Sequence, residues 1–251
     1  MELKESIELG SSRTIKKGIK IEIDEVEVHR HLGYKREQCL RSGVSSLVDS
    51  QIRTAYKFIK PAAYYTIKPI MDVGDSKVSA DGLLFTSHNL ARVFSGCSQA
   101  AIFVVTIGEA LEKEVAQLTK EGEILKAAVL DAVGSVAVEK VADWLESMIR
   151  SITATNGNKV GWRYSPGYCD WDITQQKELF RGLDGNSIGV NLTGTCLMMP
   201  RKSISGIIGM GEYCNTFSAC HFCGKKNCPN RREEFSRWHS NKIRNPKQIR
   251  V

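Results

Sequence analysis

The sequence predicts an α+β fold in which helices flank a largely antiparallel, twisted sheet. Three observations support this prediction. A continuous apolar run at residues 100–107 is typical of a buried strand. The alanine-rich residues 123–152 carry apolar side chains at helical spacing, which indicates one long helix. Strands and helices also follow one another without the strict alternation that a parallel sheet requires.

The first part of the chain contains shorter elements, which are identified by apolar spacings of two for strands and of three or four for helices. In chain order we expect a strand at 19–30, an amphipathic helix at 35–60, and strands at 62–72 and 76–86. Ser87 is a good N-cap residue and is expected to open a short helix that reaches Phe94.

The second part combines helices with a predicted hairpin. We expect a helix from about Glu109 to Lys120 before the long helix, and a strand at 160–164 after it. Asp172 and Gln175 have the spacing of a capping box for a helix that ends near Leu183. The apolar segments 191–199 and 203–210 are separated by Pro200, Arg201 and Lys202, and this pattern predicts an antiparallel hairpin.

Charge is concentrated at the C-terminal end. The formal net charge is +7, and seven basic residues face only two acidic ones between Pro229 and Val251. We interpret 231–251 as a solvated basic tail rather than a nucleic-acid-binding arm. No apolar run of about 18 residues is present, so no membrane span is expected. The N-terminus lacks the pattern of a secretion signal, and we therefore expect a cytoplasmic protein.

Eight cysteines divide into a scattered and a clustered set. The scattered ones, Cys39, Cys97, Cys169 and Cys196, are expected to be buried thiols because disulfides are rare in a reducing compartment. The clustered ones are Cys214, Cys220, Cys223 and Cys228. Their density predicts a metal site, and both tetrahedral zinc and a 4Fe–4S cluster suit the spacing. His221 lies between two of these ligands and could compete as one.

Residues Arg163-Tyr164-Ser165-Pro166-Gly167-Tyr168 form a compact candidate ligand site. A guanidinium matches a carboxylate in bidentate geometry. Pro166 biases the preceding residue to an extended conformation, and Gly167 allows the backbone to approach a ligand closely. The pattern is typical of strand-to-turn junctions as well, so the residues alone leave both readings open.

Residues 131–209 resemble the activation domain of cobalamin-dependent methionine synthase. The resemblance is carried in chain order by Asp131-Ala132, Glu139, the Arg163-x-x-x-Gly167-Tyr168 string, Leu192-Thr193, Met198-Met199-Pro200 and Ser203-Ile204-Ser205-Gly206. It covers about eighty residues, roughly a third of the chain, and several linked motifs are more specific than one string. The chain is similar to the free-standing branch of this family, because it has no Asp-x-His-x-x-Gly string of a cobalamin module.

The resemblance implies a function. Members bind S-adenosylmethionine and remethylate a cobalamin whose cobalt has been reduced from Co(II) by an electron donor. It implies that Arg163 holds the ligand carboxylate and that Ser165, Gly167 and Tyr168 complete the site. Tyr168 is expected to face the corrin, and Tyr213 is the candidate for a further ligand contact. The family's ammonium-binding aspartate has only Asp72, Asp75 and Asp81 as candidates, and Ser135 stands where the family helix carries a second acid.

These observations give a three-part organisation. Residues 1–212 form the S-adenosylmethionine-binding, activation-domain-like part, 213–230 the four-cysteine motif, and 231–251 the tail. We expect reductive remethylation of a separate corrinoid protein or cobalamin-dependent methyltransferase, with a low-potential electron donor and a built-in 4Fe–4S relay. The alternative is a zinc-stabilised module without catalysis that docks on such a partner or on nucleic acid through its tail.

Overall fold

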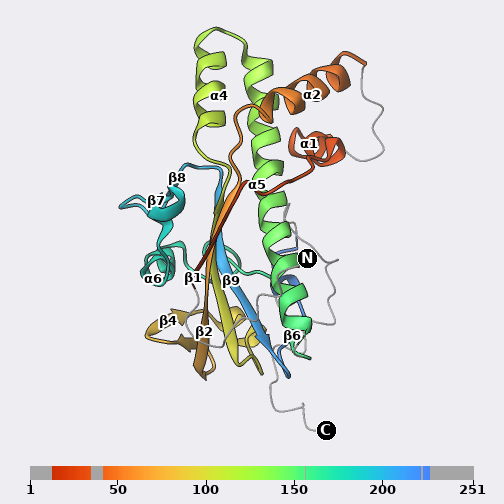
Figure 1. The fold of residues 1–251 in the computed structure, drawn as a ribbon. Coiled ribbons are helices and arrows are strands. Elements are labelled where there is room, and N and C mark those ends of the chain that lie inside the picture. The colour runs from red at the N-terminus through yellow and green to blue at the C-terminus, as the bar shows by residue number, and fades with distance from the viewer. Residues whose placement is uncertain (1–12, 35–41, 156, 222, 227–251) are drawn as a thin grey trace, which may run out of the picture.

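The fold was described from a computed structural model, which defines residues 13–34, 42–155, 157–221 and 223–226. The main sheet has seven antiparallel strands, in the order β4-β3-β2-β5-β9-β6, with β1 paired to the first half of β2 (Figure 1). Its strands are β1 (Arg13–Lys17), β2 (Ala62–Val73), β3 (Lys77–Ala80), β4 (Leu83–Thr86), β5 (Gln99–Thr106), β6 (Lys159–Val160) and β9 (Ser203–Gly211). The predicted α+β class with an antiparallel sheet is confirmed.

Helices cover both faces of this sheet. The bounds are α1 (Glu25–His31), α2 (Ser42–Ala55), α3 (His88–Val93), α4 (Ala110–Lys120), α5 (Ile124–Ala154) and α6 (Gln176–Arg181), with short 3-10 turns η1 (Ile173–Gln175), η2 (Gly185–Ile188) and η3 (Ala219–His221). Helix α5 runs along one face, where α1, α2 and α4 pack against it (Figure 1). None of the described helices is both long and apolar enough to cross a membrane.

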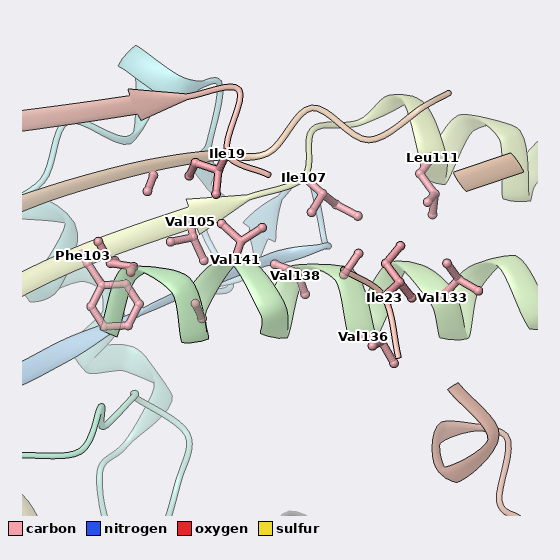
Figure 2. Close-up of a cluster of buried hydrophobic side chains, with 14 of the residues drawn as sticks. Ile19, Ile23, Phe103, Val105, Ile107, Leu111, Val133, Val136, Val138 and Val141 are labelled. Carbon is pink, nitrogen blue, oxygen red and sulfur yellow. The ribbon is translucent and has the colours of Figure 1, made fainter. Parts of the chain in front are cut away.

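Strand β5 joins the two hydrophobic cores because its side chains alternate between the faces of the sheet. Phe103 and Val105 pack toward Val138 and Val141 of α5, as Figure 2 shows. Ile102 and Val104 belong to the opposite core, with Leu90 of α3, Leu179 of α6 and Trp171. Burying one such side chain contributes about 1.5–3 kcal/mol. The continuous apolar run therefore reflects a central strand that is covered on both faces.

The region of the predicted strand 19–30 is different from the expectation. Residues 19–24 form no regular element, and α1 begins at Glu25 after Asp24, whose side chain accepts a hydrogen bond from the amide of Val26 at 2.9 Å. Ile19, Ile23 and Val28 all enter the core that α5 covers. The apolar alternation therefore arises from an irregular segment packed on a helix, and an acidic N-cap then changes the periodicity.

The predicted hairpin of 191–199 and 203–210 is also wrong. The first segment folds on itself as a separate two-stranded sheet, β7 (Asn191–Leu192) and β8 (Met198–Met199). The second is β9, which pairs with β5 through residues 203–210 and with β6 at its end. Nearly every residue of β9 is buried. A strand buried in this way needs neighbours on both sides and cover on both faces, and a two-stranded hairpin does not provide them.

Two predicted caps have different outcomes. Ser87 caps α3 as expected, since its hydroxyl accepts from the amide of Leu90 at 3.0 Å. Asp172 caps η1 by accepting from the amide of Thr174 at 2.8 Å. Gln175 does not complete a capping box, because its side-chain oxygen accepts instead from the amide of Thr86 at 2.9 Å. That bond ties the residues before α6 to the end of β4.

Candidate functional site

The candidate motif folds into a tight turn at the edge of the sheet. The carbonyl oxygen of Ser165 accepts from the amide of Tyr168 at 3.3 Å, which closes a four-residue turn around Pro166 and Gly167. Gly167 has φ +92°, a value that side-chain-bearing residues rarely adopt. Proline followed by a positive-φ glycine is the signature of a type II turn. The turn therefore has the backbone conformation that a proline followed by a glycine favours.

Aromatic packing holds the turn in place. The Tyr164 hydroxyl donates to the carbonyl oxygen of Tyr168 at 3.0 Å. The amide of Gly167 donates to the carbonyl oxygen of Trp171 at 2.7 Å. The rings of Tyr164 and Trp171 stack at a centroid distance of 5.3 Å, and both residues are buried. Burial raises the pKa of Tyr164, so its hydroxyl remains a donor. Tyr168, by contrast, is 46% exposed and is presented on a supported turn.

Asp170 fastens the turn to the start of α3. Its carboxylate accepts from the Ser87 hydroxyl at 2.7 Å, from the amide of His88 at 2.7 Å and from the amide of Asn89 at 3.3 Å. Partial burial acts to raise the pKa of Asp170, but these hydrogen bonds outweigh it and the pKa is lowered. The carboxylate is therefore ionised at neutral pH and stabilises the junction between the motif and α3.

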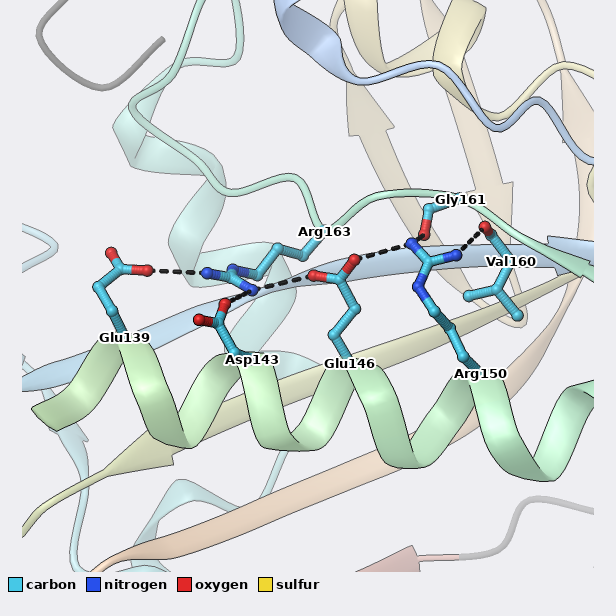
Figure 3. A network of polar contacts seen from close by, with 7 residues as sticks. All are labelled: Glu139, Asp143, Glu146, Arg150, Val160, Gly161 and Arg163. Carbon is cyan, nitrogen blue, oxygen red and sulfur yellow. Dashed lines mark hydrogen bonds and ion pairs between the residues drawn. The ribbon is translucent and has the colours of Figure 1, made fainter. Parts of the chain in front are cut away.

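Strand pairing directs Arg163 toward α5. Tyr164 forms a bridge with Ile207 of β9, and the backbone amide and carbonyl of Tyr164 exchange hydrogen bonds with those of Ile207 at 3.0 and 2.9 Å. The absence of a side chain at Gly206 allows this approach, because a Cβ there would lie 2.6 Å from the backbone carbonyl oxygen of Tyr164. The adjacent Arg163 side chain then points to the helix (Figure 3).

The Arg163 guanidinium is surrounded by three carboxylates of α5. Its nitrogens lie 2.8 Å from Glu139, 2.7 Å from Asp143 and 2.9 Å from Glu146 (Figure 3). The Arg163 side chain is only 6% exposed. Burial disfavours its charge, but Asp143 and Glu139 outweigh that effect and the pKa of Arg163 is raised. The site therefore holds one buried cation and an excess of negative charge.

Glu146 connects this cluster to a second arginine. One oxygen of Glu146 contacts Arg163, and the other accepts from Arg150 at 2.8 Å. Arg150 also donates to the carbonyl oxygens of Val160 and Gly161 and lies 5.4 Å from the centroid of the Trp162 ring. These side chains also border an open pocket, which is lined by Asp143, Glu146, Ser147, Arg150 and Trp162. Residues 160–163 are thus attached to α5 by ionic and cation–π contacts and hydrogen bonds.

Sequence reasoning found one of the three carboxylates, Glu139, and only as a matching position. Asp143, Glu146 and Arg150 were missed. The signal was present, because Glu139, Asp143, Glu146 and Arg150 recur at helical steps of four, three and four and therefore share one face of α5. The sequence could not show that a strand would place an arginine against that face.

The other proposed ligand contacts are dispersed. Tyr213 follows β9, is 75% exposed, and has its backbone against Gly96. Asp72 lies on β2 opposite Ser79, and the carboxylate of Asp81 is paired with Lys68 at 2.7 Å. No contact in the described structure assigns either aspartate to the motif.

Ser135, at the position of the expected second acid, is engaged by a cation. The Lys202 ammonium lies 2.8 Å from the Ser135 hydroxyl and 2.8 Å from an Asp131 oxygen. This lysine is only 13% exposed. A positive charge from the protein therefore lies beside this position of α5.

The cysteines are arranged differently from the prediction. Cys214 forms a disulfide with Cys97, so it is not available as a metal ligand in this structure. Cys220 and Cys223 are described as thiols, and Cys228 lies outside the described residues. The expected thiol Cys97 is buried as predicted but is oxidised. Among the described residues, no group of three or more His, Cys, Asp or Glu side chains could hold a metal ion.

Cys169 contacts the C-terminal cysteines. Its thiol hydrogen-bonds with those of Cys223 and Tyr164, and Cys220 lies within electrostatic range. Partial burial raises the pKa of Cys169 to about 12, and the contacts with Cys223 and Cys220 act in the same direction. A thiol with so high a pKa is protonated at neutral pH and is a poor nucleophile. The predicted burial of Cys169 is wrong, because this residue as a whole is exposed, whereas Cys196 is buried as expected.

Comparisons with known proteins agree with this fold. The crystal structure of the MetH reactivation domain bound to AdoHcy is similar, with a TM-score of 0.64 and 15% identity over 83% of this chain and 80% of that one. At this identity the likeness concerns the fold. No curated protein matches. Residues 91–230, more than half of the chain, match the family described as "Vitamin B12 dependent methionine synthase, activation domain". The chain therefore belongs to the family of vitamin B12 dependent methionine synthase activation domains.

Proposed function

We propose that this chain reactivates a separate corrinoid protein by supporting its reductive methylation with S-adenosylmethionine. Membership of the activation-domain family supports this role. The similar crystal structure contains AdoHcy, the molecule that remains when S-adenosylmethionine has given up its methyl group. The observation that carries the proposal is the Arg163–Tyr168 motif, in which a buried guanidinium and an exposed aromatic ring flank one tight turn.

The proposed reaction has two steps. A low-potential one-electron carrier protein reduces Co(II) of the partner's corrinoid to Co(I). Co(I) then attacks the sulfonium methyl of S-adenosylmethionine, so that a cobalt–carbon bond forms, the sulfur–carbon bond breaks and S-adenosylhomocysteine leaves. The part of this chain is to hold the donor in line with the cobalt, and orientation of this kind contributes several kcal/mol.

The residues around Arg163 fit the amino-acid end of the donor. That end carries one carboxylate and one ammonium, and an arginine–carboxylate pair is complementary to both. Asp143 and Glu139 are the better partners for the ammonium, because they are 52% and 44% exposed, whereas Glu146 is buried. We propose that the ligand carboxylate accepts hydrogen bonds from the Arg163 guanidinium. The ligand ammonium then binds Asp143 or Glu139. The excess negative charge of the site also favours a ligand with a net positive charge.

The turn supplies the remaining contacts. Backbone groups at Ser165 and Gly167 lie beside Arg163 in sequence and are proposed to hold the ligand. Tyr168 is proposed to form the wall that faces the corrin, and its exposure allows contact with a large flat ring. Tyr213, whose backbone lies against Gly96, is proposed as a further contact.

We further propose that the C-terminal cysteines bind a 4Fe–4S cluster that relays the electron, with zinc as the alternative. The Cys-x-x-Cys spacing of Cys220 and Cys223 supports this proposal. Thiolates suit both metals, whereas only the cluster transfers electrons. Zinc without iron or sulfide in anaerobically purified protein would rule out the relay but not S-adenosylmethionine binding.

The proposal can be tested by calorimetry and methyl transfer. S-adenosylmethionine carrying an isotopically labelled methyl is mixed with the full chain, chemically reduced cobalamin and a purified cobalamin-binding domain of a methionine synthase. We expect methylcobalamin to form in the presence of the chain, as detected by its visible spectrum and label. Absence of both S-adenosylmethionine binding and methyl transfer would favour the zinc-stabilised docking module.

A further inference from the structure

A second arginine, Arg150, lies next to the Arg163 cluster and takes no part in the proposed ligand contacts. Its guanidinium donates to the carbonyl oxygen of Val160 at 2.7 Å, to that of Gly161 at 2.9 Å and to a Glu146 oxygen at 2.8 Å (Figure 3). A planar guanidinium holds several oxygen atoms at fixed angles, whereas a lysine ammonium on its flexible stem is a point charge. Arg150 therefore fixes two backbone groups and one carboxylate relative to α5.

The backbone just before the motif contains one extra residue relative to its partner strand. The amide of Gly161 donates to the carbonyl oxygen of Gly209 at 2.9 Å, and Tyr164 forms a bridge with Ile207. Three steps along this segment, from 161 to 164, thus face two steps along β9, from 209 to 207. An extra residue of this kind, as in a β-bulge, changes the direction in which a nearby side chain points.

The extra residue turns Arg163 toward α5. Val160 belongs to the core that α5 covers, and Arg163 points to the same helix. Side chains three residues apart in a regular strand lie on opposite faces of the sheet, so the direction of Arg163 depends on the irregular step. Arg150 holds the carbonyl oxygens of Val160 and Gly161 at the beginning of that step. It therefore acts on the direction of Arg163 through the backbone.

Glu146 links Arg150 to Arg163 in a second way. One oxygen of Glu146 lies 2.9 Å from Arg163 Nη1, and the other accepts from Arg150. The Glu146 side chain is only 7% exposed, so its charge must be compensated within the protein. Without Arg150, the buried carboxylate would depend on Arg163, which already contacts Asp143 and Glu139. Arg150 therefore reduces the competition between Glu146 and a ligand carboxylate for Arg163.

We propose that Arg150 is a positioning residue that keeps Arg163 directed toward, and available for, the carboxylate of S-adenosylmethionine. The inference deepens the proposed function and rests on it. Arg150 acts in two ways, because it fixes the backbone before Arg163 and compensates part of the charge of Glu146. Removal of Arg150 should therefore weaken a ligand that carries a carboxylate and spare a ligand that lacks one.

Two ligands separate this role from a structural one. The full chain and its Arg150→Gln variant are titrated by calorimetry with S-adenosylmethionine and with its decarboxylated analogue, which carries one more net positive charge. We expect Arg150→Gln to bind S-adenosylmethionine at least about five-fold more weakly, since a small misplacement of a binding group has a large effect. The analogue should bind equally well or more tightly, because the variant leaves more uncompensated negative charge.

Arg181→Gln is the matched control. Arg181 is also paired with a glutamate of its own helix, at 2.6 Å, but its side chain is 65% exposed. We expect this variant to bind both ligands as the parent chain does. A loss in Arg181→Gln equal to that in Arg150→Gln would overturn the inference, because it would show a general effect of removing an arginine.

The remaining results decide the inference as well. Unchanged affinity for S-adenosylmethionine in Arg150→Gln, or an equal loss for both ligands, overturns it. If far-UV circular dichroism shows that Arg150→Gln does not fold, Arg150→Lys takes its place. Lysine keeps the charge but not the planar fork, so a selective loss is still expected and full affinity overturns the inference. A parent chain that binds neither ligand refutes the proposed function as a whole, whereas the other results concern Arg150 alone.

Discussion

Arg163 Nη1 lies 2.9 Å from Glu146 Oε2, and both side chains are almost completely buried, at 6% and 7% exposure. Removing one partner of a buried pair leaves an uncompensated charge and costs about 3–5 kcal/mol. Because Arg163 would keep Asp143 and Glu139, we expect Glu146→Ala to lower the free energy of unfolding by about 3 kcal/mol. Urea unfolding measures this difference.

The exposed partner Glu139 provides the comparison. It is 44% exposed, and pairs of that kind contribute less than about 1 kcal/mol. Glu139→Ala should therefore be nearly neutral, as should Arg181→Ala, which removes a 65% exposed side chain paired with Glu178. Equal losses in Glu146→Ala and Glu139→Ala would contradict the buried arrangement.

The carboxylate of Asp170 should make stability depend on pH in the acid range. Hydrogen bonds lower its pKa in the folded state below the value of about 3.9 for an unfolded chain. The stabilisation is therefore present above pH 4 and is lost as the pH falls through the folded pKa. We expect the difference in unfolding free energy between the parent and Asp170→Asn to shrink between pH 5 and pH 2.5. A constant difference would refute this role.

Local signals predicted the parts of the fold that local chemistry decides. Helix α5, strand β5, the Ser87 cap and the Pro166–Gly167 turn all follow from periodicity, burial or fixed φ values. The failures concern pairing over distance. Strand β9 pairs with β5 about a hundred residues earlier rather than with its sequence neighbour, because a central position buries both of its faces.

The site shows the same division. The sequence identifies Arg163 as a guanidinium in a ligand-binding pattern but does not show its three carboxylate partners. Those contacts require the bridge between Tyr164 and Ile207, which rotates Arg163 toward α5. Likewise, spacing alone could not show that Cys214 is bonded to Cys97, which lies 117 residues earlier in the chain.

Close approach at Gly206 makes it a sensitive probe of the motif. A Cβ there would lie 2.6 Å from the backbone carbonyl oxygen of Tyr164 and 2.9 Å from the hydroxyl oxygen of Ser165. We expect Gly206→Ala to cost about 1–3 kcal/mol through overpacking and to weaken S-adenosylmethionine binding by displacing the turn. Gly194→Ala is the control, since no atom lies within 4 Å of its added Cβ. Equal stability of the two variants would contradict the packing at Gly206.

Recognition of both ends of the donor's amino acid can be separated by charge. Arg163→Lys keeps the positive charge but loses the planar fork, so carboxylate binding should weaken by at least about ten-fold. Asp143→Asn keeps the size of the side chain and removes a charge, and we expect it to weaken S-adenosylmethionine while sparing an analogue that lacks the ammonium. Calorimetry with both ligands measures these effects. Equal loss for the two ligands in Asp143→Asn would assign Asp143 only to holding Arg163. With half of its side chain exposed, Asp143 can turn from the arginine to a ligand, whereas the buried Glu146 cannot.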